Sequence, residues 1–448
     1  MITDAINHYH DLLAPIAEAT QAAMNHELDK RRLYFGKHPV CRVLRPHFYF
    51  PDHWEYLVRR TRLVLSAFAK MHHAAMRDPD LRAQLYLEPY EEELFVTDLN
   101  RVSVPWSSSR LDAFYRVETG YLRFVEYNAE TPAGIGYGDN LTDAFMALDV
   151  MKQFEGRYNV FRTYGLPQLL GVVLRGYADW GGTVKPQIAI VDWQDVPTRN
   201  EHEITREYFE QHGYSTICCD PRELELRGDK LYHGDFRVDI IYKRVLISEL
   251  VARAGMDSAV VRAVRAGAVF MTNSFSAKLL AKKASLAVLS DERNGHLFDV
   301  EERSAIEQHI PWTREVIDRP TIYEGREIDL LPYVSDNRDR FVIKPNDEYG
   351  GAGVVIGWEC DQEAWDQAIQ TALNNPFVVQ ERVTIVERDF PQMIDGRLDI
   401  SPRFVDTDPY IFYGQEVAGC LTRLSSVALL NVTAGTGSVV PMFLIAPK

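Results

Sequence analysis

The glycine-rich segment 341–358 places the strongest constraint on how this chain can fold. Its sequence is Phe-Val-Ile-Lys-Pro-Asn-Asp-Glu-Tyr-Gly-Gly-Ala-Gly-Val-Val-Ile-Gly-Trp. Two apolar runs flank a turn that contains Gly350, Gly351 and Gly353, a pattern that predicts two strands joined by a hairpin. Because glycine has no side chain, the backbone of such a turn can approach a ligand closely and direct its N–H groups at anionic oxygens.

Two charged side chains support an anion site at this hairpin. Lys344 places a compact positive charge at the base of the turn, and Glu348 could hold a metal ion against the same anion. The combination predicts a flexible hairpin that covers nucleotide phosphates. The string Gly-x-x-x-x-Gly-Lys-Ser/Thr does not occur in the sequence, which excludes a P-loop. From these residues alone, an ordinary glycine-containing hairpin remains the alternative.

Length and composition restrict the class of protein. A chain of 448 residues is too long for one typical core, so two or three substructures are expected. The net charge of −15 argues against a nucleic-acid surface. The five cysteines are scattered and form neither a disulfide nor a zinc pattern. Without a signal peptide or an 18-residue apolar run, we expect a cytoplasmic protein that does not bind a membrane. The sequence does not indicate the oligomeric state.

A second hairpin is predicted over residues 110–128. The β-rich runs 110–117 and 121–128 are separated by Glu-Thr-Gly120. A three-residue loop pairs Val117 with Tyr121, and this register determines every other pair along the two strands.

The predicted register gathers four polar side chains on one face of the hairpin. Asp112 lies opposite Glu126, and Arg110 lies opposite Asn128. Two carboxylates that face each other repel unless a cation lies between them. A divalent cation with oxygen ligands would relieve this repulsion, and Mg²⁺ bound also to phosphates is the natural candidate. The alternative is a solvated polar face on which Arg110 weakens the repulsion.

Residues 186–245 alternate strand and helix patterns, which predicts a small Rossmann-like α/β unit with parallel strands. Arg244 follows the last of these strands, where open α/β sheets present ligand-binding groups. It could bind a substrate carboxylate, and a surface arginine is the alternative.

The last third of the chain contains further polar groups beside predicted strands. Residues 273–290 are predicted as a helix that carries Lys282 and Lys283, and consecutive lysines on a helix are usually solvated. The strand from residue 376 runs into Gln380-Glu-Arg-Val383. Later strand ends carry polar groups that suit a second wall of a phosphate site, and these are Asp406, Arg423 and Asn431.

Taken together, these motifs resemble the circularly permuted branch of the ATP-grasp superfamily, which includes glutathionylspermidine synthase and eukaryotic glutathione synthetase. The similarity covers the motifs and their order from about residue 110 to the end. In that branch an Arg-x-Asp pair precedes a Glu-x-Asn pair, as Arg110/Asp112 precedes Glu126/Asn128 here. Its glycine loop follows a Lys-Pro and carries a metal-binding acid four residues after the lysine, as in this chain.

The resemblance implies a role for each of these residues. Arg110 would be catalytic and Arg244 would bind substrate. Lys283 would reach the nucleotide phosphates, with Lys282 as its rival. Mg²⁺ would be held by Asp112, Glu126, Asn128 and Glu348. ATP would be bound by Lys283, Lys344, Gly350, Gly351, Gly353, Gln380, Glu381 and Val383. Asp406, Arg423 and Asn431 are further candidates.

The fold class that follows is α/β with α+β elements, a permuted ATP-grasp fold with an inserted Rossmann-like domain. The expected parts are a helical region 1–100, a first ATP-grasp part 101–180, a substrate domain 181–270 and the main ATP-grasp domain 271–448. The N-terminal amidase half of some glutathionylspermidine synthases is not evident. Arg423 and Asn431 resemble uncharacterised permuted ATP-grasp proteins more than glutathione synthetase, so the substrate stays open.

The expected activity is that of an ATP-dependent carboxylate–amine ligase working through an acylphosphate, similar to glutathionylspermidine synthase. Its partners would be a small-molecule acid and a small-molecule amine. Two alternatives stay open: a nucleotide-binding scaffold or sensor without turnover, and a kinase that stops at a phosphorylated product. All of these expectations require Glu126 and Glu348 to converge on one cleft.

Overall fold

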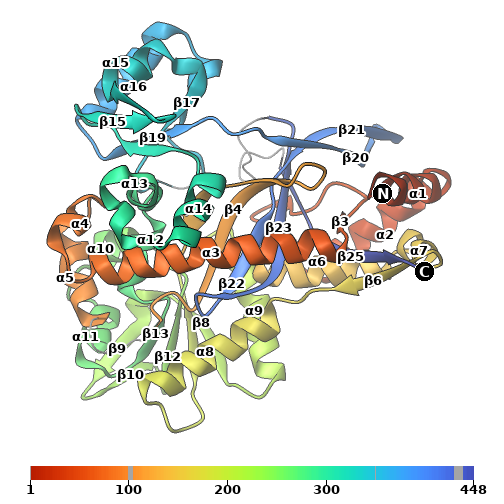
Figure 1. Cartoon of the computed structure of the whole chain (residues 1–448). Helices are drawn as coiled ribbons and strands as arrows, with labels where there is room; N and C mark the ends of the chain where they lie inside the picture. The colour runs from red at the N-terminus through yellow and green to blue at the C-terminus, as the bar shows by residue number, and fades with distance from the viewer. Residues whose placement is uncertain (1, 99–103, 349, 428–436) are drawn as a thin grey trace.

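The computed structural model describes residues 2–98, 104–348, 350–427 and 437–448. Its N-terminal region is mainly helical, as the sequence predicts. The longest helix crosses the front of the molecule in Figure 1 and buries apolar side chains at helical spacing, among them Leu57, Val64 and Phe68. The helices are α1 (Ile2–Leu13), α2 (Ala17–Lys30), α3 (Pro51–Ala75), α4 (Pro79–Ala83) and α5 (Pro89–Phe95).

The central sheet joins residues 108–128 to the C-terminal quarter of the chain. Its strands follow the order β20-β21-β23-β22-β4-β5, and β24 pairs with β23. Tyr410 in β22 pairs with Arg110 in β4, which places two distant segments side by side. The strands are β4 (Ser108–Arg116), β5 (Tyr121–Asn128), β20 (Val386–Ile394), β21 (Arg397–Val405), β22 (Asp408–Phe412), β23 (Glu416–Ser425) and β24 (Ser438–Val440).

The β4–β5 hairpin contains the predicted residue pairs, but its turn and its regularity differ from the prediction. Asp112 lies opposite Glu126, and Arg110 lies opposite Asn128. The predicted pairing of Val117 with Tyr121 is wrong, because Arg116 pairs with Tyr121 across a turn that is one residue longer than expected. A β-bulge between Asp112 and Ala113 compensates for this shift.

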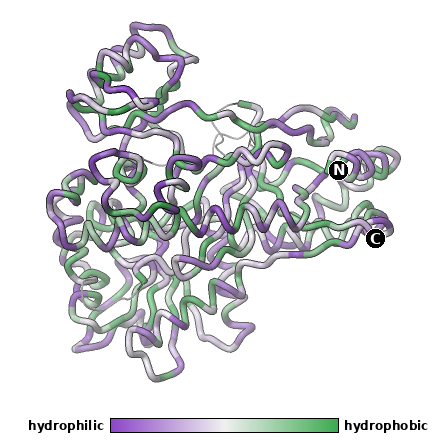
Figure 2. Tube along the Cα trace, in the orientation of Figure 1, coloured by the Kyte–Doolittle hydropathy of each residue, from purple (hydrophilic) through white to green (hydrophobic). Residues whose placement is uncertain are grey.

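The predicted parallel sheet is present and has the order β13-β12-β7-β8, with every neighbouring pair parallel. This region contains much of the hydrophobic, green trace in Figure 2. Its strands are β7 (Ile188–Val191), β8 (Thr216–Cys219), β12 (Ile240–Lys243) and β13 (Phe270–Thr272). Nearby are α8 (Leu166–Trp180), α9 (Arg199–Gln211), α10 (Ile247–Ala254), α11 (Ala259–Ala266) and the antiparallel strands β9 (Leu224–Arg227), β10 (Lys230–His233) and β11 (Phe236–Val238).

A third sheet joins β3 (His47–Tyr49), β25 (Met442–Pro447) and β6 (Tyr158–Arg162), so the C-terminal strand lies between two N-terminal segments. The helices α6 (Ile135–Ala147) and α7 (Asp149–Phe154) precede β6. No described helix is long and apolar enough to cross a membrane.

The glycine hairpin belongs to a small lobe at the top of Figure 1. Its sheet has the order β14-β19-β17-β18, and it has its own core around Phe341, Ile343 and Trp365. The strands are β14 (Thr313–Glu315), β17 (Phe341–Pro345), β18 (Val355–Ile356) and β19 (Phe377–Glu381). The lobe also contains β15 (Pro320–Tyr323), β16 (Arg326–Asp329), α15 (Leu330–Asp336) and α16 (Gln362–Leu373).

The predicted helix 273–290 is broken. α12 (Lys278–Ala281) ends before Lys282, and α13 (Ala284–Ser290) begins after Lys283. The expectation that these two lysines are solvated is wrong, because their exposed fractions are 2% and 8%. α14 (Val300–His309) follows and packs on α3.

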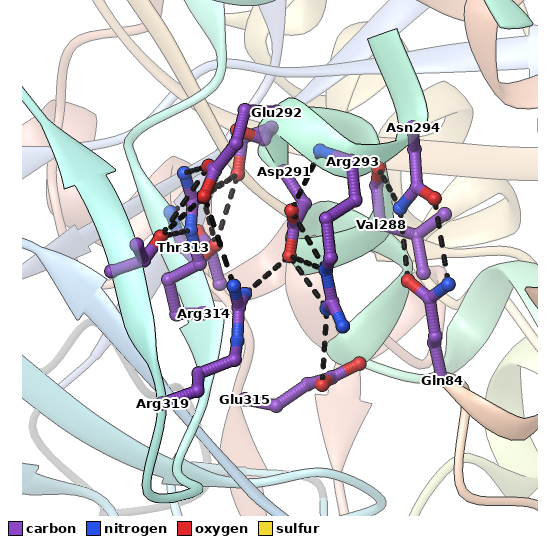
Figure 3. Close-up of polar contacts among 12 residues, drawn as sticks. Gln84, Val288, Asp291, Glu292, Arg293, Asn294, Thr313, Arg314, Glu315 and Arg319 are labelled. Atoms are coloured by element: carbon purple, nitrogen blue, oxygen red, sulfur yellow. Dashed lines mark hydrogen bonds and ion pairs between the residues drawn. The ribbon is translucent and has the colours of Figure 1, made fainter. Parts of the chain in front are cut away.

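A polar network connects the end of α13 to the small lobe (Figure 3). Asp291 accepts hydrogen bonds from Arg293 and from Arg319 of the lobe. Arg314 of the lobe donates to Glu292, with 2.6 Å between Nη2 and Oε2. The lobe is therefore held to the body by charge-assisted hydrogen bonds next to the helix that begins after Lys283.

Candidate functional site

A cleft with a cavity volume of about 180 Å³ lies between the glycine hairpin of the small lobe and the central sheet. Most of the residues singled out from the sequence line it. They are Asp112, Glu126, Lys283, Lys344, Glu348, Gly350, Gly351, Gln380, Glu381, Val383, Asp406 and Arg423.

Part of the cleft wall is apolar. The strand β19 and the residues that follow it form an edge, where Gln380 is buried and Val383 faces the cavity. A flat, apolar base could lie against such a surface and hydrogen-bond to the neighbouring backbone. The apolar side chains here are Ala113, Phe114, Val125, Val342, Val354, Ile356, Val383 and Ile385.

Two lysines also line the cleft. Lys283 lies 3.0 Å from Glu126, measured from Nζ to Oε1, and its Nζ also donates to the carbonyl oxygen of Glu348 at 2.6 Å. The Lys344 ammonium donates to Gln380 Oε1 at 2.7 Å. Burial lowers the pKa of Lys344 to about 8, and Lys283 adds to this effect, while Glu126 opposes it. Lys282 instead points to a separate ion-pair network.

The Asp112 carboxylate is bound on both oxygens by protein groups. Arg110 Nε and Asn128 Nδ2 donate to Oδ1 at 2.8 and 2.9 Å, and Arg423 Nη2 donates to Oδ2 at 2.6 Å. Burial favours the neutral acid, but Arg110 and Arg423 outweigh it and lower the pKa of Asp112 to about 2. Arginines therefore neutralise Asp112, and Lys283 lies beside Glu126.

Two more acids complete this cluster. Asp406 accepts from both the backbone N–H and the Nε of Arg423, each at 2.6 Å, and Asp408 lies 3.1 Å from Arg423 Nη2. Burial raises the pKa of Asp406 and of Asp408, and the nearby Asp112 raises both further, although Arg423 opposes the shift.

Arg110 does not line the cleft. Its exposed fraction is 7%, and its guanidinium is occupied by Asp112 and by the carbonyl oxygen of Ala133. Arg423, by contrast, lines the cleft, as does Arg382. Arg110 therefore contacts the cleft through Asp112.

The four predicted metal ligands do not form a closed metal site. Among the residues that the structure describes, no three His, Cys, Asp or Glu side chains are grouped to hold an ion. Asp112 already accepts from arginines, and Asn128 is turned toward it. Glu126 and Glu348 line the cleft together. They fit Mg²⁺, which typically takes one or two carboxylates and completes its shell with phosphates and water.

The turn glycines have different surroundings. Gly350, Gly351 and Gly353 have φ values of 66°, 79° and 70°, a region that side chains disfavour. Gly350 and Gly351 line the cleft. A Cβ atom at Gly353 would lie 2.7 Å from Cγ of Pro345, so this glycine permits close packing outside the cleft.

A second cavity of about 670 Å³ adjoins the cleft and shares Glu126, Lys283 and Glu348 with it. Asn128 and Arg244 line this second cavity. Sequence patterns did not predict this cavity, because its walls come from α5, β5, α10, α12 and the segments between elements, which share no motif. The other walls include Tyr90, Asp192, Thr198, Ser248 and Glu249.

The Arg244 side chain is buried and donates to the carbonyl oxygen of Pro132. Together with Asp192, it follows adjacent parallel strands at their carboxyl ends, as expected for a ligand site in an α/β sheet. Asn431, the remaining candidate, lies outside the described residues.

Two polar residues beside the cleft were missed. Lys278 lines the second cavity, and Asp347 precedes Glu348 in the glycine hairpin. The spacing of Lys278 and Lys282, one helical turn apart, was the available signal that both point the same way.

Comparisons with known proteins agree with this geometry. A family model described as circularly permuted ATP-grasp type 2 matches residues 105–425. A protein of Frankia casuarinae that carries the name glutamate–cysteine ligase 2-2 is 25% identical over 332 residues, which are 70% of this chain and 36% of that protein. A Frankia alni protein with the name glutamate–cysteine ligase 2-3 is 26% identical over 330 residues, again 70% and 36%. The match thus spans about a third of the length of these curated relatives.

A solved structure shares the fold at low sequence identity. It is that of a glutathione synthetase-like effector from Globodera pallida without ligand. The TM-score is 0.59 at 11% identity, with 96% of this chain and 94% of that chain covered.

Proposed function

The chain belongs to the circularly permuted ATP-grasp type 2 family, and on this premise we propose that it is an ATP-dependent carboxylate–amine ligase. One observation carries the proposal: the cleft and the second cavity meet at Glu126, Lys283 and Glu348. A nucleotide in the first and an acid in the second would bring a γ-phosphate and a carboxylate to the same three residues.

ATP would lie with its base against the apolar part of the wall and its phosphates at the lysines. The edge formed by Gln380, Glu381 and Val383 would bind adenine. Lys283 and Lys344 would neutralise the phosphates as compact cations, and the glycine turn would cover them with backbone N–H groups. In the structure, Glu126 and Gln380 accept from these ammonium groups.

Glu126 and Glu348 would hold Mg²⁺ beside the phosphates. The ion would supply charge neutralisation of the transferring phosphoryl group. Asp112 would act through Arg423 and Asn128, since its own oxygens are already hydrogen-bonded.

The reaction has two steps. An oxygen of the substrate carboxylate attacks the γ-phosphorus, the bond to the ADP oxygen breaks, and an acylphosphate and ADP form. The amine nitrogen then attacks the acyl carbon, the bond to phosphate breaks, the nitrogen loses a proton, and an amide and phosphate result. The protein contributes positioning and charge stabilisation, in which Lys283 and Arg423 face the cleft and Arg110 orients Asp112.

The substrates enter through the second cavity. Arg244 would bind a carboxylate there, because a guanidinium matches carboxylate geometry. The names of the Frankia relatives make glutamate with cysteine one pair to test. The resemblance to glutathionylspermidine synthase makes glutathione with spermidine another.

The test is ADP release by the purified chain with Mg²⁺ and ATP against a panel of amino acids, peptides and polyamines, with product mass measured in parallel. The proposal expects ADP and an amide in equal amounts for at least one pair. ADP with a phosphorylated product and no amide would indicate a kinase. Nucleotide binding without turnover for any pair would indicate a scaffold or sensor.

A further inference from the structure

The carboxylate of Asp347 is held by two buried lysines. Lys278 Nζ lies 2.6 Å from Oδ1, and Lys282 Nζ lies 2.9 Å from Oδ2. The exposed fractions of the two lysines are 4% and 2%. Asp347 is the residue before Glu348, so this pair of contacts fixes the glycine hairpin at the point where it reaches the junction of the two cavities.

The same lysines are anchored away from the hairpin. Lys282 Nζ lies 2.8 Å from Glu91 Oε2 in α5. Lys278 Nζ lies 2.8 Å from Glu130 Oε2, and the other oxygen of Glu130 accepts from the backbone N–H of Ile247 at the start of α10. One ionic network therefore joins the N-terminal helices, the wall of the second cavity and the glycine hairpin.

The residue on the other side of Asp347 is fixed as well. Asn346 is buried, its side-chain oxygen accepts from the N–H of Ala284 at 2.8 Å, and its Nδ2 donates to the carbonyl oxygen of Leu85 at 2.9 Å. Its own carbonyl oxygen accepts from the N–H of Lys283 at 3.0 Å. The hairpin and the break between α12 and α13 are thus held together on both sides of Lys283.

We infer that Asp347 is a positioning residue, held by Lys278 and Lys282, that sets where Glu348 and Lys283 meet the bound nucleotide and its metal ion. The inference rests on the proposed function, which assigns Glu348 to the metal and Lys283 to the phosphates. Stability alone does not account for the arrangement, because burying ion pairs costs desolvation that their attraction often only balances. The network instead holds an otherwise exposed turn in one place, with 30% of the Asp347 side chain still exposed.

The experiment compares Asp347→Asn with Glu91→Gln. Both remove one negative charge from the same two lysines, but Glu91 lies on α5 and outside the hairpin. Binding of ADP would be measured by calorimetry with Mg²⁺ and with EDTA, alongside the melting temperature of each variant. Groups that orient metal ligands typically contribute about 10–100-fold in affinity. We therefore expect Asp347→Asn to weaken binding at least tenfold with Mg²⁺ and much less with EDTA, and Glu91→Gln to weaken it less than Asp347→Asn does, because both lysines still contact Asp347.

The outcomes separate the inference from the proposed function. Equal weakening by the two variants, or none by Asp347→Asn, would overturn the positioning role. If wild type itself binds no nucleotide, the proposed function fails and the inference with it. If Asp347→Asn does not fold, Asp347→Glu is measured in its place, because it keeps the negative charge and moves the carboxylate by one methylene. Weaker ADP binding at a normal melting temperature is then expected, and unchanged binding would contradict the inference.

Discussion

Lys283 and Glu126 form an ion pair of 3.0 Å between α13 and the central hairpin, and the same ammonium reaches the backbone of Glu348 in the glycine hairpin. One cation therefore contacts both hairpins that the sequence analysis required to converge. Phosphate oxygens carry more negative charge than either partner of Lys283. A nucleotide in the cleft would therefore bind the Lys283 ammonium in place of Glu126, and the Glu126 carboxylate would become available to bind a metal ion.

Replacing Lys283 by methionine should reduce kcat/KM for ATP by about 10²–10³-fold, because one charged contact to the transferring group is lost. Since Lys283 is nearly buried, methionine preserves its volume better than alanine does. The measurement is ADP release at varied ATP, with the melting temperature as a check on folding.

Lys152 provides the matched control for this change. It forms an ion pair of 2.7 Å with Asp149 on the surface, where both side chains are more than half exposed. Lys152→Met should leave ADP release unchanged. A Lys283→Met enzyme with near-normal kcat/KM would remove this lysine from the phosphate site.

Nucleotide affinity should fall as the pH rises above about 8, since burial lowers the pKa of Lys344 to that value. Below pH 8 the ammonium is charged and binds phosphate; above it the neutral amine does not. If only the charged form binds, the Kd for ADP rises by about tenfold per pH unit. Calorimetry between pH 7 and pH 9.5 tests this, and Lys344→Arg, which stays charged, should flatten the profile. A constant Kd in wild type would contradict the assignment.

The register of the β4–β5 hairpin was predictable from the sequence only in part. The pairs Asp112–Glu126 and Arg110–Asn128 were predicted and are confirmed. The turn length was wrong, and the bulge after Asp112 restored the register. Alternation of polar and apolar residues specifies which faces are buried, and that constraint survives an error at the turn.

Family and fold class were also predictable, and the family match confirms the circularly permuted ATP-grasp assignment. The burial of Lys282 and Lys283 could not be predicted from the sequence. Helical periodicity favours solvated lysines. In the structure, the helix breaks at Lys282 and Lys283, and the backbone N–H of Lys283 donates a hydrogen bond to the carbonyl oxygen of Asn346, more than sixty residues away in the sequence. The second cavity was not predictable either, because helices, a strand and loops from distant parts of the chain form it together.

Arg423→Leu should destabilise the protein by about 3 kcal/mol, the typical cost of removing one partner from a buried ion pair. The change leaves Asp112 and Asp408 paired with Arg110 and removes the guanidinium that pairs with Asp406. Urea denaturation measures the loss. Arg227, which pairs with Glu225 at 2.7 Å on the surface, is the matched control.

For Arg227→Leu the expected change is under about 1 kcal/mol, since exposed ion pairs contribute little. Equal effects of the two substitutions would show that the acids of the cluster do not depend on Arg423 for their charge balance.

Asp291→Asn should loosen the small lobe without unfolding the body. Asp291 accepts from Arg293 at 2.7 Å and from Arg319 of the lobe (Figure 3), and a lost charged hydrogen bond of this kind costs about 1.5–3 kcal/mol. Hydrogen exchange in β14 and β15 should become at least tenfold faster, while exchange in β7 and β12 stays unchanged. The control is Asp339→Asn, which removes a lobe carboxylate paired with Arg338 at 3.0 Å and 68% exposed.

The pH dependence of the same contact gives a second test. Burial would raise the pKa of Asp291, but hydrogen bonds from Arg293 and the charges of Arg314 and Arg319 outweigh it and lower the pKa below the ordinary value of 3.8. The charged form is therefore favoured in the folded protein, so its stabilisation is complete above the ordinary pKa and is lost as the pH falls below it. Exchange in β14 should accelerate in wild type between pH 4 and pH 2 relative to β7, after correction for intrinsic rates. In Asp291→Asn this extra acid dependence should disappear; if it persists, another group holds the lobe in place.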